Sequence, residues 1–271
     1  MKKVVFAVVL GAAYGLFALS AAPAARASTV VKEVRKSFPL KPGGELSLEN
    51  VNGGIRMEGW DENRVEVQAT IRVRHSSRRR AEKYLQEVEI FFDHGDDFLH
   101  IDVDYPGKSG GGDFWSWLFG HRPPSVSITF ELKVPRQLDV DVRTVNGKVD
   151  IARLEGDIQV RTTNGAIRVE NVAGKVSCRT VNGGISVSLE KVGRFDEMSL
   201  KTVNGSIRLA VPRDIRADLE ASTVNGHISS DLPIELRGRI SRRSLHGKIN
   251  GGGGFIILKT VNGSISLRES E

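Results

Sequence analysis

The stretch that decides the fold is DIQVRTTNGAIRVENVAGKVSCRTVNGGISV, residues 157–187. It contains two copies of one pattern: a short strand with alternating apolar residues, an Asn-Gly turn and a second short strand. The apolar residues of the second copy follow those of the first at a constant spacing. This arrangement predicts short strands that stack on one another, each with one buried and one solvated face.

The Asn-Gly pair recurs along most of the chain. From Asn146 onward the steps between turns are 18, 18, 22, 21, 21 and 16 residues, when His246-Gly247 is counted as one of the turns. A period near twenty residues is typical of a solenoid. We therefore predict a mainly β fold, a right-handed parallel β-solenoid (β-helix) with rungs of about 16–22 residues and a small α+β excursion near its N-terminal end.

A series of antiparallel hairpins is the main structural alternative, because Asn-Gly also suits tight hairpin turns. The solenoid is favoured because the turn keeps its sequence from repeat to repeat and because apolar positions align at the full period. A shorter turn at half-period, at Gly156 and Gly174, divides each repeat into two strands. The number of faces in a rung stays open. One predicted column contains Val142, Val160, Cys178 and Leu200.

The turn residues are interpreted as structural rather than as a ligand-binding row. Glycine, and often asparagine, can adopt the positive φ that a sharp corner requires. Stacked asparagine amides and threonine hydroxyls can also hydrogen-bond from rung to rung. The predicted ladder consists of Asn52, Asn146, Asn164, Asn182, Asn204, Asn225 and Asn262, with Thr144, Thr162, Thr180, Thr202, Thr223 and Thr260.

A row of valines follows the threonines of this ladder. Strict alternation would point these side chains outward as an exposed apolar stripe, which usually contacts a partner. The interpretation that we favour is a corner that folds them inward. The row contains Val145, Val181, Val203, Val224 and Val261.

The remaining chain divides into four predicted parts. Residues 1–27 have the layout of a cleaved signal peptide, with two lysines, an apolar run and a small-residue site at 25–27; an uncleaved membrane anchor is the alternative. Export to the periplasm, cell surface or medium follows, and cleavage lowers the net charge from +6 to +3. We assign 28–60 to N-terminal strands and a first rung, 61–135 to an α+β flap, and 136–271 to the solenoid repeats.

The predicted flap has its own helix and hairpin. A helix is expected after Ser76 or Ser77 and a hairpin around Gly95. An aromatic loop at 114–119, with Trp115, Trp117 and Phe119, could contact a membrane or a partner, or fold back onto the solenoid. Three consecutive arginines at 78–80 are interpreted as a solvated helix face, and no nucleic-acid partner is expected.

Basic residues precede the ladder threonines and are expected to point outward in a row. Like charges about 4.8 Å apart repel, so such a row favours an acidic ligand; side chains that simply extend into solvent are the alternative. The candidate ligand-binding residues are Arg143, Arg161, Arg179, Lys201, Arg243 and Lys259.

Catalytic, metal and cofactor sites find no support in the sequence. It lacks a Gly-x-Ser-x-Gly elbow, a phosphate-binding Gly-x-x-x-x-Gly-Lys motif and a His-Glu-x-x-His zinc motif. The single cysteine, Cys178, falls in an inward column and is expected to be a buried structural thiol. We therefore predict a protein that is not an enzyme and binds no cofactor.

The motifs resemble those of a bacterial "putative adhesin" family. These motifs are the repeated Thr-Val-Asn-Gly-x-Ile, the Arg-Thr-Val-Asn-Gly run and Glu-Asn-Val-Asn-Gly-Gly-Ile at 49–55. The family consists of exported β-strand-repeat proteins of unknown function related to the auto-transporter adhesin head domain. The resemblance covers residues 45–267 and implies a non-enzymatic envelope solenoid. His246 in place of Asn, and Thr163 in place of the turn valine, depart from the pattern.

An adhesin-like binding module of the bacterial envelope is the expected function. Its expected partner is an acidic polysaccharide or another surface protein, and the protein is expected to be a monomer. The alternatives are a scaffold whose copies stack end to end and, third, a β-helix polysaccharide lyase or hydrolase, which would need clustered carboxylates or a metal site.

Overall fold

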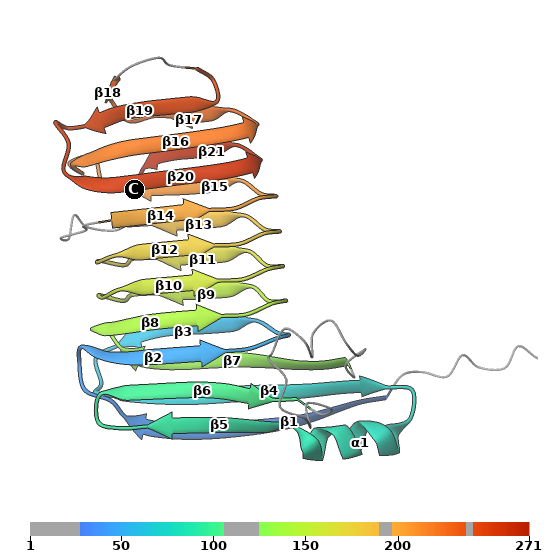
Figure 1. Ribbon diagram of the computed structural model, residues 1–271. Coiled ribbons are helices and arrows are strands. Elements are labelled where there is room, and N and C mark those ends of the chain that lie inside the picture. The colour runs from blue at the N-terminus through green and yellow to red at the C-terminus, as the bar shows by residue number, and fades with distance from the viewer. Residues whose placement is uncertain (1–27, 106–124, 190–196, 237–240, 271) are drawn as a thin grey trace, which may run out of the picture.

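The computed structural model describes residues 28–105, 125–189, 197–236 and 241–270, which form two long stacked sheets (Figure 1). One sheet has ten strands, in the spatial order β1 (Ser28–Pro39), β4 (Arg64–His75), β7 (Ser125–Pro135), β3 (Ile55–Trp60), β9 (Val149–Ala152), β11 (Ile167–Glu170), β13 (Ile185–Ser188), β15 (Ile207–Val211), β21 (Ile265–Glu269) and β17 (Ile228–Ser230). The other has eleven, in the order β18 (Ile234–Leu236), β19 (Ser244–Ile249), β16 (Ala217–Asn225), β20 (Gly254–Asn262), β14 (Glu197–Lys201), β12 (Val176–Arg179), β10 (Ile158–Arg161), β8 (Leu138–Arg143), β2 (Gly44–Glu49), β6 (Phe98–Asp104) and β5 (Glu89–His94).

The core lies between the two sheets, and each repeat contributes one strand to either side. Val160 pairs in parallel with Val142 on one side and with Cys178 on the other, and Cys178 pairs with Leu200. All four side chains are buried. Each fully buried aliphatic side chain of this kind contributes about 1.5–3 kcal/mol relative to exposure. The mainly β prediction is confirmed, and the stacked parallel rungs fit a β-solenoid; its handedness stays a prediction.

The glycines of the Asn-Gly turns are required by close packing rather than by backbone conformation. Among them only Gly53 has a positive φ, of 123°. At the other positions an added Cβ would overlap the carbonyl of the next glycine in the stack, as at Gly165 against Gly147. The expectation of positive φ at this corner is therefore wrong for the later turns. Positive φ occurs instead at the half-period corner, at Arg153, Gly156, Asn171 and Gly174.

The spatial order of the rungs departs from their sequence order at the C-terminal end. β20 pairs in parallel with β14 on one side and β16 on the other, and β21 likewise lies between β15 and β17. The last rung of the sequence is thus inserted between two rungs that precede it. His246 does not take a place in the asparagine row, because it lies in β19, which runs antiparallel to β16 and sets His246 opposite Glu220.

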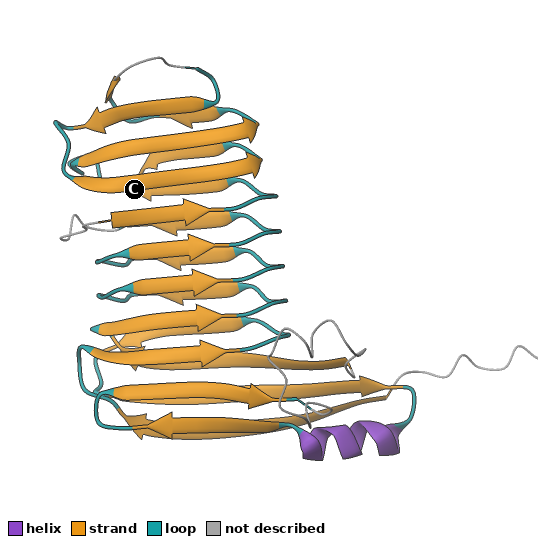
Figure 2. Cartoon of the chain, in the orientation of Figure 1, coloured by secondary structure: helices purple, strands orange, loops and turns teal. Residues whose placement is uncertain are grey.

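The excursion between the first two rungs extends both sheets. β4 and β7 continue the ten-stranded sheet as antiparallel strands, whereas β6 pairs in parallel with β2 and carries the β5 hairpin. Helix α1 (Arg78–Glu87) packs on β1 and β4 through the buried Ala81, at the N-terminal end of the stack (Figure 2). Ser77 occupies the N-cap position without a capping side-chain hydrogen bond. The described residues contain no helix with the length and hydropathy needed to cross a membrane.

Candidate binding surface

The turn asparagines form one hydrogen-bonded row along the corner of the stack. Each side-chain amide donates to the Oδ1 of the preceding asparagine in space, over 2.7–2.8 Å. All the donors point in the same direction, so every internal amide both donates and accepts within the row. Each internal amide thus uses one of its two N–H donors and one of its two oxygen lone pairs within the row, which supports the structural interpretation. The spatial order is Asn52, Asn146, Asn164, Asn182, Asn204, Asn262 and Asn225.

The ladder threonines are buried and face the core side of the same corner. Five of them donate to a glycine carbonyl of the neighbouring rung, over 2.8–3.5 Å, and these are Thr162, Thr180, Thr202, Thr223 and Thr260. The hydroxyl of Thr144 has no hydrogen-bond partner among the described residues. At the first rung Asn50 replaces the threonine, and its amide donates to the carbonyls of Gly53 and Ile128.

The basic residues that precede the threonines lie side by side on the outer face of the eleven-stranded sheet. The strand register places Arg143, Arg161, Arg179, Lys201 and Lys259 next to one another in that order. We call these five residues the basic row. Arg243 is not part of it, because Ser222 follows Lys259 and pairs with Ser244 in an antiparallel strand.

The two ends of the basic row are neutralised by carboxylates. Arg143 contacts Glu49 at 2.9 Å and Asp141 at 2.6 Å. Lys259 contacts Glu220 at 2.7 Å, and this hydrogen bond lowers the pKa of the Glu220 carboxyl. Glu49 and Glu220 come from the neighbouring strands β2 and β16, whereas Asp141 lies on the same strand as Arg143.

The middle of the basic row carries positive charge that no described carboxylate holds at hydrogen-bonding distance. Arg161 lies 4.0 Å from Asp141, beyond hydrogen-bonding distance. Arg179 and Lys201 have no ion pair with any residue in the described part of the chain. The column beside them carries Ser177 and Ser199, which offer hydroxyls but no charge. An anionic group placed here would therefore meet cations that no carboxylate of the fold already occupies.

Comparison with known families gives this architecture a name. Residues 138–268 match the family model described as Toastrack DUF4097. This segment resembles a Toastrack domain, and we use that name for it below. It contains the whole basic row, whereas Asn52 and the N-terminal strands precede it.

Several solved structures are similar to the chain. A "putative cell adhesion protein" from Clostridium sporogenes is 11% identical over 88% of this chain and 100% of its own, with a TM-score of 0.49. A "putative adhesin" from Bacteroides fragilis is 12% identical over 88% and 97%, with a TM-score of 0.37. A "putative lipid binding protein" from Parabacteroides distasonis is 9% identical over 88% and 97%, with a TM-score of 0.26. The comparison with curated proteins finds no match.

The valine row of the Toastrack domain faces outward over most of its length. Val181, Val203 and Val261 are 38–39% exposed and Val224 is 54% exposed, whereas Val145 is 6% exposed. The favoured inward corner is therefore wrong for four of the five valines. The corner directs the residue after each inward threonine away from the core, as strict alternation requires.

A groove opens at the first two rungs of the Toastrack domain. Its volume is about 320 Å³. Arg143 and Arg161 line it together with Glu49, Val145 and Thr163. The threonines between them point into the core, which leaves room between the two outward rows.

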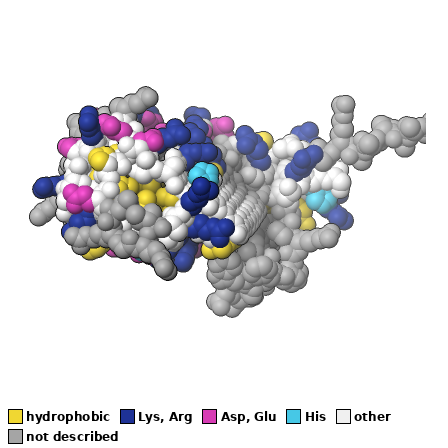
Figure 3. Space-filling model, turned by 90° about the horizontal axis from the view of Figure 1, so that it is seen from above, with side chains coloured by type: hydrophobic (Ala, Val, Ile, Leu, Met, Phe, Trp, Pro, Cys, Tyr) yellow, Lys and Arg dark blue, Asp and Glu magenta, His cyan; other side chains and the backbone are white. Residues whose placement is uncertain are grey.

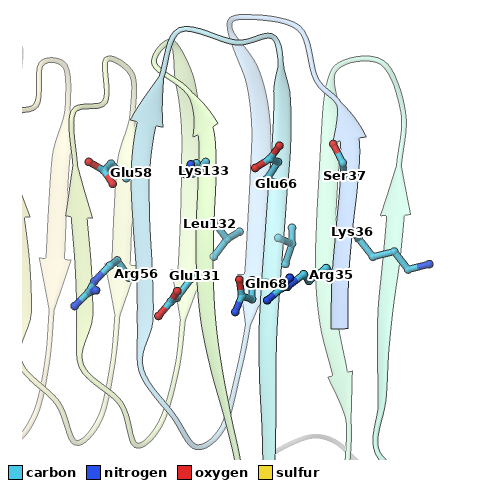
Figure 4. A pocket seen from close by; sticks show the side chains of 11 residues that line it. Arg35, Lys36, Ser37, Arg56, Glu58, Glu66, Gln68, Glu131, Leu132 and Lys133 are labelled. Carbon is cyan, nitrogen blue, oxygen red and sulfur yellow. The ribbon is translucent and has the colours of Figure 1, made fainter. Parts of the chain in front are cut away.

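A second hollow, of about 610 Å³, lies on the outer face of the ten-stranded sheet (Figure 4). Its charges alternate: Glu131 pairs in register with Arg56, and Lys133 stands between Glu66 and Glu58. The lining has four basic and three acidic side chains, so its charges largely cancel. Seen from above, basic side chains are spread around the end of the stack with acidic ones among them (Figure 3).

Two kinds of reactive site bear on catalysis by the described residues at these surfaces, a metal centre and a reactive thiol. No group of His, Cys, Asp or Glu that could hold a metal ion occurs in the described ranges. Cys178 is fully buried, and burial raises the pKa of its thiol to about 12. A thiol with such a pKa is protonated at neutral pH and is not a nucleophile. The predicted aromatic residues Trp115, Trp117 and Phe119, and the predicted signal peptide, lie outside the described residues.

Proposed function

We propose that the protein is an exported, non-enzymatic binding module, adhesin-like in role, whose basic row binds an acidic polysaccharide of the bacterial envelope. The observation that carries the proposal is the positive charge of Arg161, Arg179 and Lys201 on three adjacent strands, which no described carboxylate holds at hydrogen-bonding distance. Cations held at rung spacing suit a linear polymer that repeats its anionic groups along its length. Export rests on the signal-peptide layout of residues 1–27.

The rigidity of the stack supports this proposal. Arg179 and Lys201 sit on strands whose neighbours on both sides are paired in register, and each strand has a fully buried inner face. Their backbone positions are therefore fixed before any ligand arrives. A preorganised row of this kind loses less conformational entropy on binding than charges on a loop.

The test is a binding measurement with an oligogalacturonate of defined length and with a neutral maltodextrin. In water a close charge pair contributes about 1 kcal/mol, so the double variant Arg179→Ser, Lys201→Ser should bind the oligogalacturonate about 30-fold more weakly. Serine already occupies this column at Ser222, so the sheet tolerates it. Binding by the unaltered protein should weaken as salt is added.

A matched control removes the same charge from the opposite sheet. Arg168→Ser, Arg208→Ser changes two outward cations on β11 and β15. If the control variant lost as much affinity as the double variant in the basic row, net charge rather than the row would be responsible. Binding that does not change with salt, or equal binding of maltodextrin, would also refute the proposal.

A further inference from the structure

The groove at the first two rungs contains an unusual turn. The asparagine of this turn belongs to the asparagine row, but the turn is the one in the Toastrack domain that keeps this place without the sequence Thr-Val-Asn-Gly. Thr163 stands where the other turns of that row have valine. The fold accepts valine at every other such turn, whether buried as at Val145 or exposed as at Val224. The stack therefore does not require threonine here. A residue that breaks a local pattern without a structural need is a candidate for a functional role.

The hydroxyl of Thr163 is available to a ligand. The side chain is half-buried, and it makes no hydrogen bond with any residue of the described ranges. Its backbone carbonyl accepts a hydrogen bond from the backbone N–H of Asn182. By contrast, the buried Thr162 beside it donates to Gly147. The turn thus has one hydroxyl that serves the fold and one that faces the groove.

The two arginines of the groove differ in availability. Arg143 is held by Glu49 and Asp141, so its guanidinium is neutralised and fixed in place. Arg161 has only the distant Asp141 oxygen, 4.0 Å away. The groove therefore presents one weakly paired cation, Arg161, beside the Thr163 hydroxyl, and its lining also includes the Glu49 carboxylate and the largely buried Val145.

We propose that this groove seats one carboxylate-bearing sugar unit and anchors one end of the polysaccharide on the basic row. The sugar carboxylate pairs with Arg161, and a sugar hydroxyl bonds the Thr163 hydroxyl. From there the polymer continues over Arg179 and Lys201. The inference rests on the proposed function, and it adds a site that distinguishes a sugar acid from an anion of any other kind.

The test is the single variant Thr163→Val, which restores the residue found at the other turns and so keeps the fold. Loss of one hydrogen bond predicts three- to tenfold weaker binding of the oligogalacturonate. The slope of log Kd against log salt concentration should stay unchanged, because no charge is removed. An unfolding midpoint at or above that of the unaltered protein checks that the variant is folded.

The matched control is Val203→Thr, which places the same hydroxyl at an exposed turn two rungs away. It should leave the affinity unchanged. If Thr163→Val bound as tightly as the unaltered protein while Arg179→Ser, Lys201→Ser bound more weakly, the groove inference would be wrong and the proposed function would stand. If the unaltered protein did not bind the oligogalacturonate, both would fall.

Discussion

The close approach of the turn glycines makes a quantitative prediction for the variant Gly165→Ala. An alanine Cβ at this position would overlap the carbonyl of Gly147 in the adjacent rung. The two rungs would have to separate at a point where the Gly147 amide donates to the Asn164 carbonyl at 3.1 Å and the Thr162 hydroxyl donates to the Gly147 carbonyl at 3.5 Å. Overpacking costs about 1–3 kcal/mol, and weakening two hydrogen bonds adds about 1 kcal/mol each. We expect a loss of about 3–5 kcal/mol in the free energy of unfolding.

The measurement is urea unfolding followed by circular dichroism, together with hydrogen exchange. Because stacked repeats interact mainly with their neighbours, the fastest-exchanging amides of the variant should lie in the rungs around residue 165. The control is Gly54→Ala, since a Cβ there meets nothing closer than the Lys148 carbonyl at 3.5 Å. Its free energy of unfolding should change by less than about 0.5 kcal/mol.

A second variant separates steric overlap from backbone conformation. If a positive φ were the requirement at this corner, Gly165→Asn would be milder than Gly165→Ala, because asparagine tolerates that region. Overlap predicts that asparagine destabilises at least as much as alanine, since both carry a Cβ. A Gly165→Ala protein as stable as the unaltered one, or an asparagine variant clearly more stable than the alanine variant, would refute the close-packing argument.

Three further predictions follow from the same corner and the sheet beside it. Thr180→Val should lower the free energy of unfolding by about 1 kcal/mol, because it removes a hydrogen bond to the Gly165 carbonyl. Thr144→Val should be neutral or stabilising, because the Thr144 hydroxyl has no partner among the described residues. Urea unfolding of both variants is the measurement. The hydrogen bond to Lys259 lowers the pKa of Glu220 in the folded protein. The ionised carboxylate therefore stabilises the fold above its unfolded-state pKa, and this stabilisation is lost as the pH falls through the lower folded-state pKa. The difference in stability between the unaltered protein and Glu220→Gln should vanish in acid. Cys178, whose pKa burial raises to about 12, should react with a thiol reagent at pH 8 only at the rate of unfolding, and rapid labelling under native conditions would contradict its place in the core.

The sequence repeat predicted the stacked columns of buried side chains, because the two features that produce them can be recognised in short stretches of sequence. Period-two alternation assigns the inward face, and the constant spacing of the turns aligns one inward residue with the next. Val160 and Cys178 meet for these two reasons. The role of the turn glycines could not be predicted in the same way, because the distance between neighbouring rungs is a property of the stack and not of any one turn.

The position of the basic row could be predicted from the sequence, but which of its cations are paired with carboxylates could not. Alternation places Arg143 and Arg161 on the outer face, and the period sets them side by side. Which of the two arginines is held by a carboxylate at hydrogen-bonding distance depends in part on Glu49. This residue lies 94 residues before Arg143 in the chain and contacts it only once the intervening excursion has folded. The exposed valines also went unpredicted. At a corner the sequence pattern does not indicate whether the backbone turns before or after the outward residue.

The order of the rungs shows what a repeat leaves undetermined. β14, β16 and β20 share one inward pattern, so each of the three could stack on either of the others. In sequence order, Lys201 would be followed by the neutral Ser222, and the row of cations would end there. The inserted rung instead brings Lys259 beside Lys201. The length of the basic row, and with it the length of anionic polymer that we propose it binds, is therefore set by the return of residues 254–269 into the stack and not by the repeat itself.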